Sequence, residues 1–283
     1  MINPPAMSQN HFKQQADSDR ATVFFRNDDV RGSLDNNLVY LTEKLVSAGF
    51  PISHAVEPAN VSREVVDWLL AIKAAYPGRV EILQHGYEHR IKTKPPHRGE
   101  FGGNRAYEEQ LNEIRKGVAL MSTHFADHWT RIFSFPYGAY NHNTLKALEM
   151  CGFKMISTGV RFTRKRKILN YVGHMFKMSR FMGYNIVYFS EKKPKYSLYD
   201  FPVMLNNTKR QTGPDAGVQL SCDELRGAWR KVPPRYKTRG ILCHHRFNSQ
   251  TDIEQLLAFL KVLKDEGVRF STIGGLYEEV DRL

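Results

Sequence analysis

Thr22-Val23-Phe24-Phe25-Arg26-Asn27-Asp28-Asp29 is a short β-type run that ends in two carboxylates, and the pattern that continues from it decides the fold class. Helical spacing of apolar residues follows over 34–48 and stops at Gly49, before a second strand-like run over 52–56. Further strands are expected over 79–84, 131–135, 153–157, 240–243 and 268–271, and helices over 62–75, 107–124, 143–151, 222–231, 252–266 and 274–280.

Strands that alternate with helices over such short connections indicate parallel strands joined by right-handed crossovers, which is an α/β arrangement. About seven strands are expected, one fewer than in the eight-fold barrel. In folds of this kind the groups that carry chemistry collect at the carboxyl ends of the strands. Candidate functional residues are therefore expected where strands end.

The composition is that of a globular protein, with 283 residues, of which 41% are hydrophobic and 25% charged. These values exclude a chain that is disordered or collagen-like throughout, and no apolar run reaches the roughly 18–20 residues of a transmembrane helix. Residues 1–20 are polar, and we expect them to form a flexible tail without a signal peptide. A single domain is expected over 21–283, with a basic insertion at about 159–217 where the alternation of strands and helices breaks.

The three cysteines, Cys151, Cys222 and Cys243, are far apart in the chain and form neither a disulfide framework nor a CxxC metal site. They fit a reducing compartment, so a cytoplasmic protein is expected.

The net charge of +12 is concentrated in one stretch. Residues 161–195 carry ten Lys or Arg and one Glu, a local charge of +9. The stretch could be a solvated excursion whose apolar residues complete the core, or a basic amphipathic segment on an anionic membrane, which would place the protein peripherally on the inner membrane face. It could also bind an anionic glycan; nucleic acid is the least favoured partner, because no nucleic-acid motif is present.

Four of the expected strands end in polar or turn-forming residues: Asp28 and Asp29, His85 and His89, Phe135 to Gly138, and His244 and His245. Each signal is weak by itself. An i, i+4 histidine pair on a helical turn can bind one metal, but His124 and His128 share that spacing without a strand leading into them. The combination is stronger, because two His and one Asp supply three ligands and leave an open position, as in catalytic metal sites. A second carboxylate and a further His would supply a base and an acid.

Four segments, in this order, carry a family resemblance: Arg26-Asn27-Asp28-Asp29, His85-Gly86-Tyr87-Glu88-His89, Phe135-Pro136-Tyr137-Gly138 and Leu242-Cys243-His244. The chain from Thr22 to Leu283 resembles the polysaccharide deacetylase family (carbohydrate esterase family 4, the NodB-homology domain). The resemblance implies a distorted (β/α) barrel that removes N-acetyl groups from amino sugars. With the strand count, it predicts an α/β fold, a distorted (β/α)7-type barrel of parallel strands.

The resemblance also implies a role for each motif residue. Asp29, His85 and His89 would hold a divalent metal, and Zn2+ suits this ligand set best, with Co2+, Ni2+ or Fe2+ as alternatives. Asp28 would be the general base and His244 the acid that protonates the departing amine. The backbone N–H of Tyr137 would stabilise the oxyanion.

The chain also departs from the family pattern. The family's Arg two residues before the Pro of Pro-Tyr-Gly is Ser134 here. Arg26 could replace it, because residues 26 and 28 share a face of an extended strand. Val30 stands where Gly is usual and His245 where Asp is common, and the family's Trp/Asp motif has no match. These departures indicate a divergent branch.

We therefore expect a metal-dependent hydrolase that deacetylates an amino-sugar-containing saccharide, as a lipid- or nucleotide-linked intermediate of surface glycan biosynthesis. One alternative is a hydrolase of the same fold that cleaves a non-sugar amide or an ester. The other is a catalytically silent module that binds a glycan or lipid.

Overall fold

The computed structural model describes residues 21–94, 98–160, 168, 172, 175–176, 196–209, 217–234 and 236–282. The expected tail at 1–20 lies outside this part of the chain. So does the basic stretch 161–195, except for Ile168, Val172, Met175 and Phe176.

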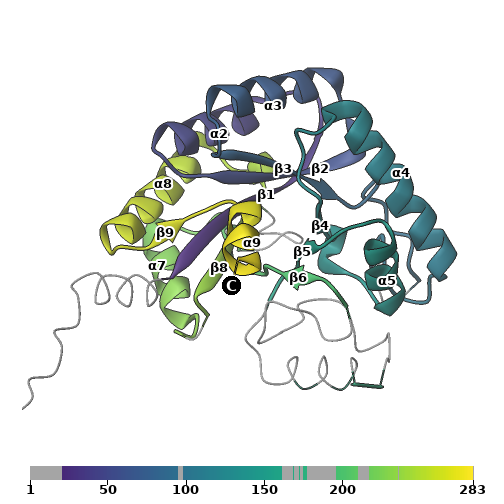
Figure 1. Cartoon of the computed structure of the whole chain (residues 1–283). Coiled ribbons are helices and arrows are strands. Elements are labelled where there is room, and N and C mark those ends of the chain that lie inside the picture. Colours follow the sequence, from purple (N-terminus) through teal and green to yellow (C-terminus); the bar gives the residue numbers. More distant parts are fainter. Residues whose placement is uncertain are drawn as a thin grey trace, which may run out of the picture.

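Parallel strands form a curved sheet at the centre of the molecule, surrounded by helices (Figure 1). The strands are β1 (Thr22–Gly32), β2 (Ile52–Val61), β3 (Val80–His85), β4 (Ile132–Ser134), β5 (Met155–Ser157), β6 (Tyr199–Asp200), β7 (Val203–Asn206), β8 (Thr238–Cys243) and β9 (Arg269–Phe270). Their order is β6-β5-β4-β3-β2-β1-β8-β7, and β9 pairs with β1. This arrangement confirms the expected α/β fold, a distorted barrel of parallel strands.

The ends of the sheet are joined by one short segment, 199–206. Its first half, β6, pairs with β5, and its second half, β7, pairs with β8. Val203 also bridges to Gly159 beyond the end of β5. The sequence pattern does not predict this strand, because Pro202 interrupts it and it lies within the region expected as an insertion.

The helices cover the outside of the strands (Figure 1). They are α2 (Asn36–Ser47), α3 (Arg63–Ala75), α4 (Tyr107–Phe125), α5 (His142–Met150), α7 (Cys222–Lys231), α8 (Gln250–Asp265) and α9 (Ile273–Asp281). Asp35 and Ser62 cap α2 and α3 through their side chains, while α7 and α8 each begin with a capping box. These caps fix where each helix starts and therefore how long each loop above the strands can be.

Helix α9 lies across the amino ends of the strands and packs its Ile273 and Leu276 against the inward-facing side chains of the barrel. The carboxylate of Glu81, in β3, fixes its start. Glu81 is fully buried and accepts hydrogen bonds from the backbone N–H groups of Ile273 (3.1 Å) and Gly274 (2.8 Å) and from the hydroxyl of Ser53 (2.7 Å). An anion at a helix N-terminus is favourable, so this contact closes the end of the barrel opposite the carboxyl ends of the strands.

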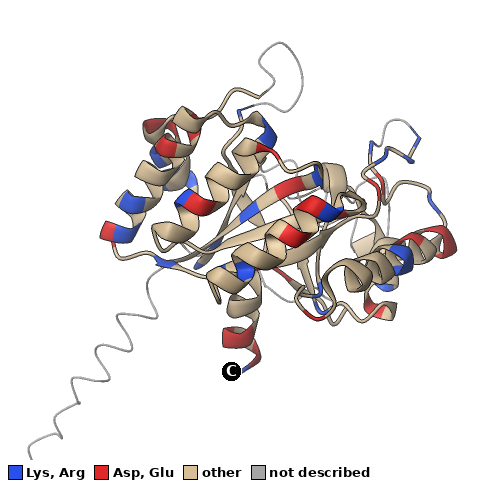
Figure 2. Cartoon of the chain, turned by 90° about the horizontal axis from the view of Figure 1, so that it is seen from above, with Lys and Arg blue, Asp and Glu red and all other residues tan. Residues whose placement is uncertain are grey.

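The described surface carries both signs of charge, mixed over the outer helices (Figure 2). No helix in the described ranges combines the length and apolar character that crossing a membrane requires.

Replacing Glu81 with Ala should destabilise the fold by about 2 kcal/mol, because three buried donors lose their charged acceptor. Denaturant unfolding of the purified protein measures this. Glu278→Ala, on the exposed side of the same helix, is the matched control and should change stability by less than about 0.5 kcal/mol.

A pH titration gives a second measurement. Burial raises the pKa of Glu81, partly offset by its hydrogen bonds with Ser53 and the start of α9. The folded state then retains this proton at pH values where the unfolded chain has lost it, so this group makes stability fall as pH rises from the unfolded pKa to the folded one. Glu81→Gln should remove this fall in stability with rising pH. If Glu81→Gln shows the same pH dependence of stability as the wild type, Glu81 is not its source.

Candidate active site

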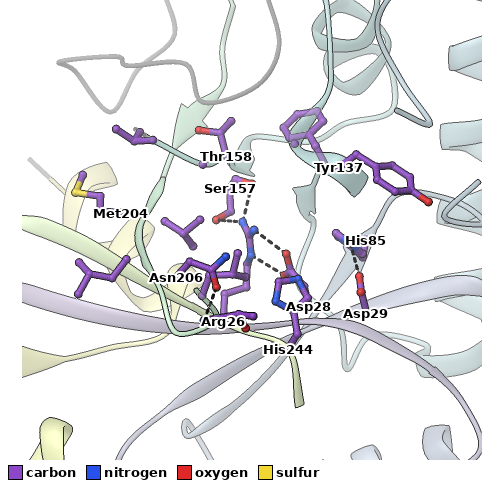
Figure 3. Close-up of a pocket in the computed structure, with 18 of the residues that line it drawn as sticks. Arg26, Asp28, Asp29, His85, Tyr137, Ser157, Thr158, Met204, Asn206 and His244 are labelled. Carbon is purple, nitrogen blue, oxygen red and sulfur yellow. Dashed lines mark hydrogen bonds and ion pairs between the residues drawn. The ribbon is translucent and has the colours of Figure 1, made fainter. Parts of the chain in front are cut away.

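A pocket of about 860 Å3 opens at the carboxyl ends of the strands. Its wall comes from β1, β3, β5, β7 and β8 and from the turn after β4. All the sequence-predicted site residues line it: Arg26, Asp28, Asp29, His85, His89, Tyr137 and His244. Figure 3 labels each of them except His89. The structure therefore gathers these candidate residues where the parallel strands end.

Strand β1 places two adjacent carboxylates in the pocket. In a regular strand Asp28 and Asp29 would point to opposite faces. The pairing of β1 with β2 shifts register between Asn27 and Val30, and Asp29 has a left-handed backbone with φ of 62°. This irregularity turns both carboxylates to the same side, as bulges near active sites commonly do.

Asp29, His85 and His89 form a compact cluster. The Asp29 Oδ1 atom lies 3.2 Å from Nε2 of His85 and 3.1 Å from Nε2 of His89. One ligand atom from each of the three residues lies within 4.8 Å of the others. Within the described ranges, no other group of three or more His, Cys, Asp or Glu side chains is arranged in this way.

The two histidines converge through a loop and not, as the sequence analysis assumed, through a helical turn. His85 ends β3, and Gly86 and His89 both have positive φ, at 62° and 54°. A buried carboxylate, Glu100, holds the loop between them by accepting hydrogen bonds from the backbone N–H groups of residues 87 (3.1 Å) and 88 (2.7 Å). A Cβ at position 86 would lie 2.2 Å from Oε2 of Glu100, so glycine is required there.

Each imidazole has a polar group behind it. The Nδ1 atom of His85 lies 2.7 Å from the hydroxyl of Ser134, whose oxygen also lies 3.5 Å from the carbonyl of Gln84. A hydroxyl that donates to a carbonyl can accept from Nδ1–H of His85, which in the neutral ring leaves the Nε2 lone pair available to a cation; a protonated ring instead donates Nε2–H to Asp29. The Nδ1 atom of His89 lies 4.0 Å from the fully buried carboxylate of Glu57.

The cluster fits a divalent cation. Two imidazole Nε2 atoms and a carboxylate oxygen are a common donor set for Zn2+ and for other first-row metals. Burial opposes ionisation of Asp29, but hydrogen bonds from His85 and His89 outweigh it and hold the pKa of Asp29 well below its usual value. Burial also opposes the charge on His85, but Asp28 and Asp29 raise its pKa, so a proton would compete with a cation for its ring nitrogen.

Asp28 is held by a bidentate ion pair with Arg26, at 2.7 Å and 2.8 Å. The other face of the guanidinium donates to the carbonyl (2.7 Å) and hydroxyl (2.6 Å) of Ser157, whose hydroxyl donates to Phe201 at the segment that joins β6 and β7. Burial by itself would raise the pKa of Asp28, but the charges of Arg26, His85 and His244 lower it. Asp28 is therefore an ionised, rigidly oriented carboxylate.

His244 and Tyr137 complete the pocket. Burial lowers the pKa of His244, although the charges of Asp29 and Asp28 oppose this shift. Tyr137 has φ of 60° within the Pro-Tyr-Gly turn, and its hydroxyl donates to the carbonyl of His89 at 2.9 Å. None of the described residues accepts a hydrogen bond from its backbone N–H, which leaves that donor available.

The other histidines named in the sequence analysis do not line the pocket. His245 is buried beneath the pocket, where its backbone N–H donates to Asn27 (2.9 Å) and its Nε2 lies 3.2 Å from Asp35 at the start of α2. It fixes the turn after β8 without lining the pocket. His124 lies near the carbonyl of Pro58 and His128 is exposed on the surface, so this spacing does not mark a second metal site.

Three supporting residues, Glu57, Glu100 and Ser157, were not recognised from the sequence. Ser157 is the last residue of β5, and Glu57 directly follows the strand expected over 52–56, so the same rule about strand ends would have indicated both, although β2 continues to Val61. Glu100 reaches the site from a loop distant in sequence, so no local pattern could identify it.

His85→Ala or His89→Ala should abolish tight metal binding, because each removes one of three protein ligands. Metal content of the purified protein, measured by atomic spectroscopy, tests this expectation. His124→Ala is the matched control and should retain metal. A full complement of metal in His85→Ala would refute the assigned ligand set.

Arg26→Ala should reduce turnover by about 10²-fold with metal retained, because Asp28 loses the contact that orients it. Arg26→Lys should recover only part of the activity, since an ammonium cannot form the same bidentate pair. Arg269→Ala, at the opposite end of the barrel, is the control and should leave turnover unchanged. Normal turnover in Arg26→Ala would leave the ion pair without a catalytic role.

Comparison with known proteins agrees with the geometry. The family model for polysaccharide deacetylases matches residues 19–156. No curated protein matches the sequence significantly. The structure is similar to that of a candidate polysaccharide deacetylase from Mycobacterium smegmatis, with 15% identity and a TM-score of 0.65 over 100% of this chain and 95% of the other.

Two further similar structures are more distant. A family 4 acetyl xylan esterase from Clostridium thermocellum, in complex with a cobalt ion, has 13% identity and a TM-score of 0.55 over 91% and 90% of the two chains. A carbohydrate esterase family 4 pseudoenzyme from Bacillus anthracis has 14% identity and a TM-score of 0.51 over 90% of this chain and 64% of the other. The sequence of residues 19–156 matches the family model for polysaccharide deacetylases, and the whole chain shares its fold with these structures.

Proposed function

We propose that the protein is a metal-dependent hydrolase that removes N-acetyl groups from an amino-sugar-containing saccharide. The observation that carries this proposal is the different environment of two adjacent carboxylates. Asp29 faces two imidazoles, whereas Asp28 faces a guanidinium. One carboxylate is thus placed to bind a cation, and the other is left to move a proton.

Hydrolysis of an amide requires a stronger nucleophile than neutral water, a stabilised oxyanion and a proton for the departing nitrogen. Asp28 can take the proton of the attacking water, since Arg26 keeps it ionised and fixes both of its oxygens. The ion pair restricts the rotation of the Asp28 carboxylate, and a general base must be held in a fixed orientation to accept a proton efficiently.

His244 is the candidate proton donor. It lines the same pocket as Asp28, from the end of β8, and the charges of Asp28 and Asp29 act on it. Burial lowers its pKa, so its protonated form is a stronger acid than a free histidine and can release the proton to an amine that would leave poorly as an anion.

The backbone N–H of Tyr137 is the candidate oxyanion donor. The left-handed conformation of Tyr137 is fixed by the Pro-Tyr-Gly turn and by the hydrogen bond from its hydroxyl to the loop carrying His89. A donor held in place before reaction costs no reorganisation when charge develops.

A divalent cation bound by Asp29, His85 and His89 would act as a Lewis acid, polarising the carbonyl and lowering the pKa of water. Zn2+ is our proposed metal, and the cobalt ion in the acetyl xylan esterase structure supports Co2+ as an alternative in a similar fold. The donor set also accommodates Ni2+ or Fe2+.

We further propose that the substrate is a lipid- or nucleotide-linked intermediate of a surface glycan, reached from the cytoplasm. The basic stretch 161–195, which would contact an anionic membrane, falls outside the described residues.

The pseudoenzyme similarity makes a catalytically silent binding module the main rival. The complete set of Asp28, Asp29, His85, His89 and His244 in one pocket favours catalysis, because a binding module needs no base and acid beside a ligand cluster. A hydrolase of an ester or of a non-sugar amide would use the same residues, and only substrate comparison separates it.

Asp28→Asn should reduce acetate release from N-acetylated saccharides by about 10²- to 10⁴-fold and leave metal content unchanged, because it removes the proton acceptor but no ligand. An enzymatic acetate assay on a panel of N-acetyl sugars, acetyl esters and non-sugar amides measures this.

Asp127→Asn, on the exposed surface, is the matched control and should retain activity. Full activity of Asp28→Asn would exclude Asp28 as the base. Release from esters or non-sugar amides alone would redirect the substrate assignment.

A further inference from the structure

The pocket extends well beyond the candidate metal ligands. We propose that the part formed by β7 and the turns beside β8 binds an uncharged, apolar substituent attached to the amino sugar, such as an aryl or alkyl aglycone. We call it the β7–β8 lobe and define it by Met204, Asn206, Leu220 and Phe247. This inference rests on the proposed function, since it specifies which part of the substrate occupies the lobe.

The positions of the proposed proton donor and the proposed metal ligands decide which part of the substrate enters the lobe. His244, the candidate donor to the departing amine, lies at the end of β8, and the Asp29 cluster lies toward β3. The amine-bearing part of the substrate must therefore lie on the β8 side of the cluster. Figure 3 shows Met204 and Asn206 on the side of Arg26 and Asp28 away from Asp29 and His85.

The lobe is mostly apolar. Phe247 is 39% exposed, an uncommon exposure for a large aromatic side chain beside a pocket, and its ring centroid lies 6.1 Å from that of His244. The backbone N–H of Phe247 donates to the carbonyl of His244 (3.0 Å), which fixes the backbone that carries the ring. Gly217 lies beside the ring, where a Cβ would come within 3.2 Å of it. A partly exposed ring next to the proposed acid is suited to contact an apolar group of the substrate.

One polar group is available in the lobe. Oδ1 of Asn206 accepts from the backbone N–H of Thr208 (3.0 Å), which fixes the amide. No described residue accepts a hydrogen bond from Nδ2 of Asn206, so this donor can bind a sugar hydroxyl. Thr208 and Lys209 also line the pocket beside the lobe, where their side chains contact Gln219 (3.2 Å) and Glu224 (2.6 Å). A neutral donor beside apolar side chains orients an uncharged ligand and does not compensate a charged one.

Charge argues against a phosphate in the lobe. Among the described residues that line the pocket beyond Arg26, Lys209 is the cation, and it is paired with Glu224 on α7 at 2.6 Å. Arg26 is itself committed to Asp28 and Ser157. A diphosphate would need two or more uncompensated donors, as arginine pairs commonly supply. Of the two carriers proposed above, an apolar group next to the sugar therefore fits the lobe better than a nucleotide diphosphate.

Direct binding tests this proposal without relying on turnover. Glucosamine and its phenyl and octyl glycosides, in both anomers, are amine products that the wild-type protein cannot deacetylate further. Calorimetry should show the phenyl or octyl glycoside binding at least about tenfold more tightly than glucosamine, a gain that one buried aromatic contact can supply. UDP-glucosamine should show no such gain.

Phe247→Ala should remove the gain, while Phe247→Tyr should retain it. Met150→Ala, which truncates an exposed apolar side chain outside the pocket, is the control and should bind as the wild type does. If Phe247→Ala does not fold, Met204→Ala provides the same comparison.

Equal affinity for glucosamine and its apolar glycosides, absence of binding by every glycoside, or tighter binding of UDP-glucosamine would overturn the assignment. Failure of the proposed function is a separate result, because it would show as absent acetate release from the N-acetyl glycosides while the gain in binding persists.

Discussion

Strand β1 must present two neighbouring carboxylates to one pocket, and the rest of the site depends on this constraint. A regular strand would bury one of them on the wrong side. The left-handed Asp29 and the register shift beside it solve the geometric problem, and Asp tolerates that conformation better than most residues. Two like charges so close would still repel. Arg26 on one side and two imidazoles on the other make both carboxylates acidic, so the pair stays ionised.

The contacts of Arg26 and His85 explain why Ser134 can stand where the family resemblance leads us to expect Arg. The guanidinium that orients Asp28 comes from Arg26, two residues earlier on the same strand, and is anchored to Ser157 across the barrel. Position 134 is thereby free for a small hydroxyl, which contacts Nδ1 of His85. An arginine there would place a cation against a ligand of a cation. The two differences from the family pattern are therefore related: the guanidinium beside Asp28 comes from β1, and the small hydroxyl at position 134 contacts the proposed ligand His85.

Much of this arrangement could be read from the sequence, because the deciding signals are local. Apolar alternation and glycine stops located most strands and helices, and period-two spacing placed Arg26 beside Asp28. What could not be read depends on contacts between distant segments. Pro202 obscured the strand that joins the ends of the sheet, the loop between His85 and His89 was taken for a helical turn, and Glu100 supports it from outside any local motif. The roles of the site residues remain predictions.

The proposed catalytic residues and the proposed substrate-binding lobe come partly from different segments of the chain. Asp28, Asp29, His85 and His89 come from β1 and β3, the part of the barrel that the family model matches. His244 and the β7–β8 lobe come from the part beyond residue 156, where the model does not extend and where the Trp/Asp motif has no counterpart. The proposed metal ligands and general base thus come from one half of the chain, and the proposed acid and the lobe come from the other. A change in β7 or in the turn after β8 could alter what is bound and leave the cation site and the base intact, which is how one barrel can serve different saccharides.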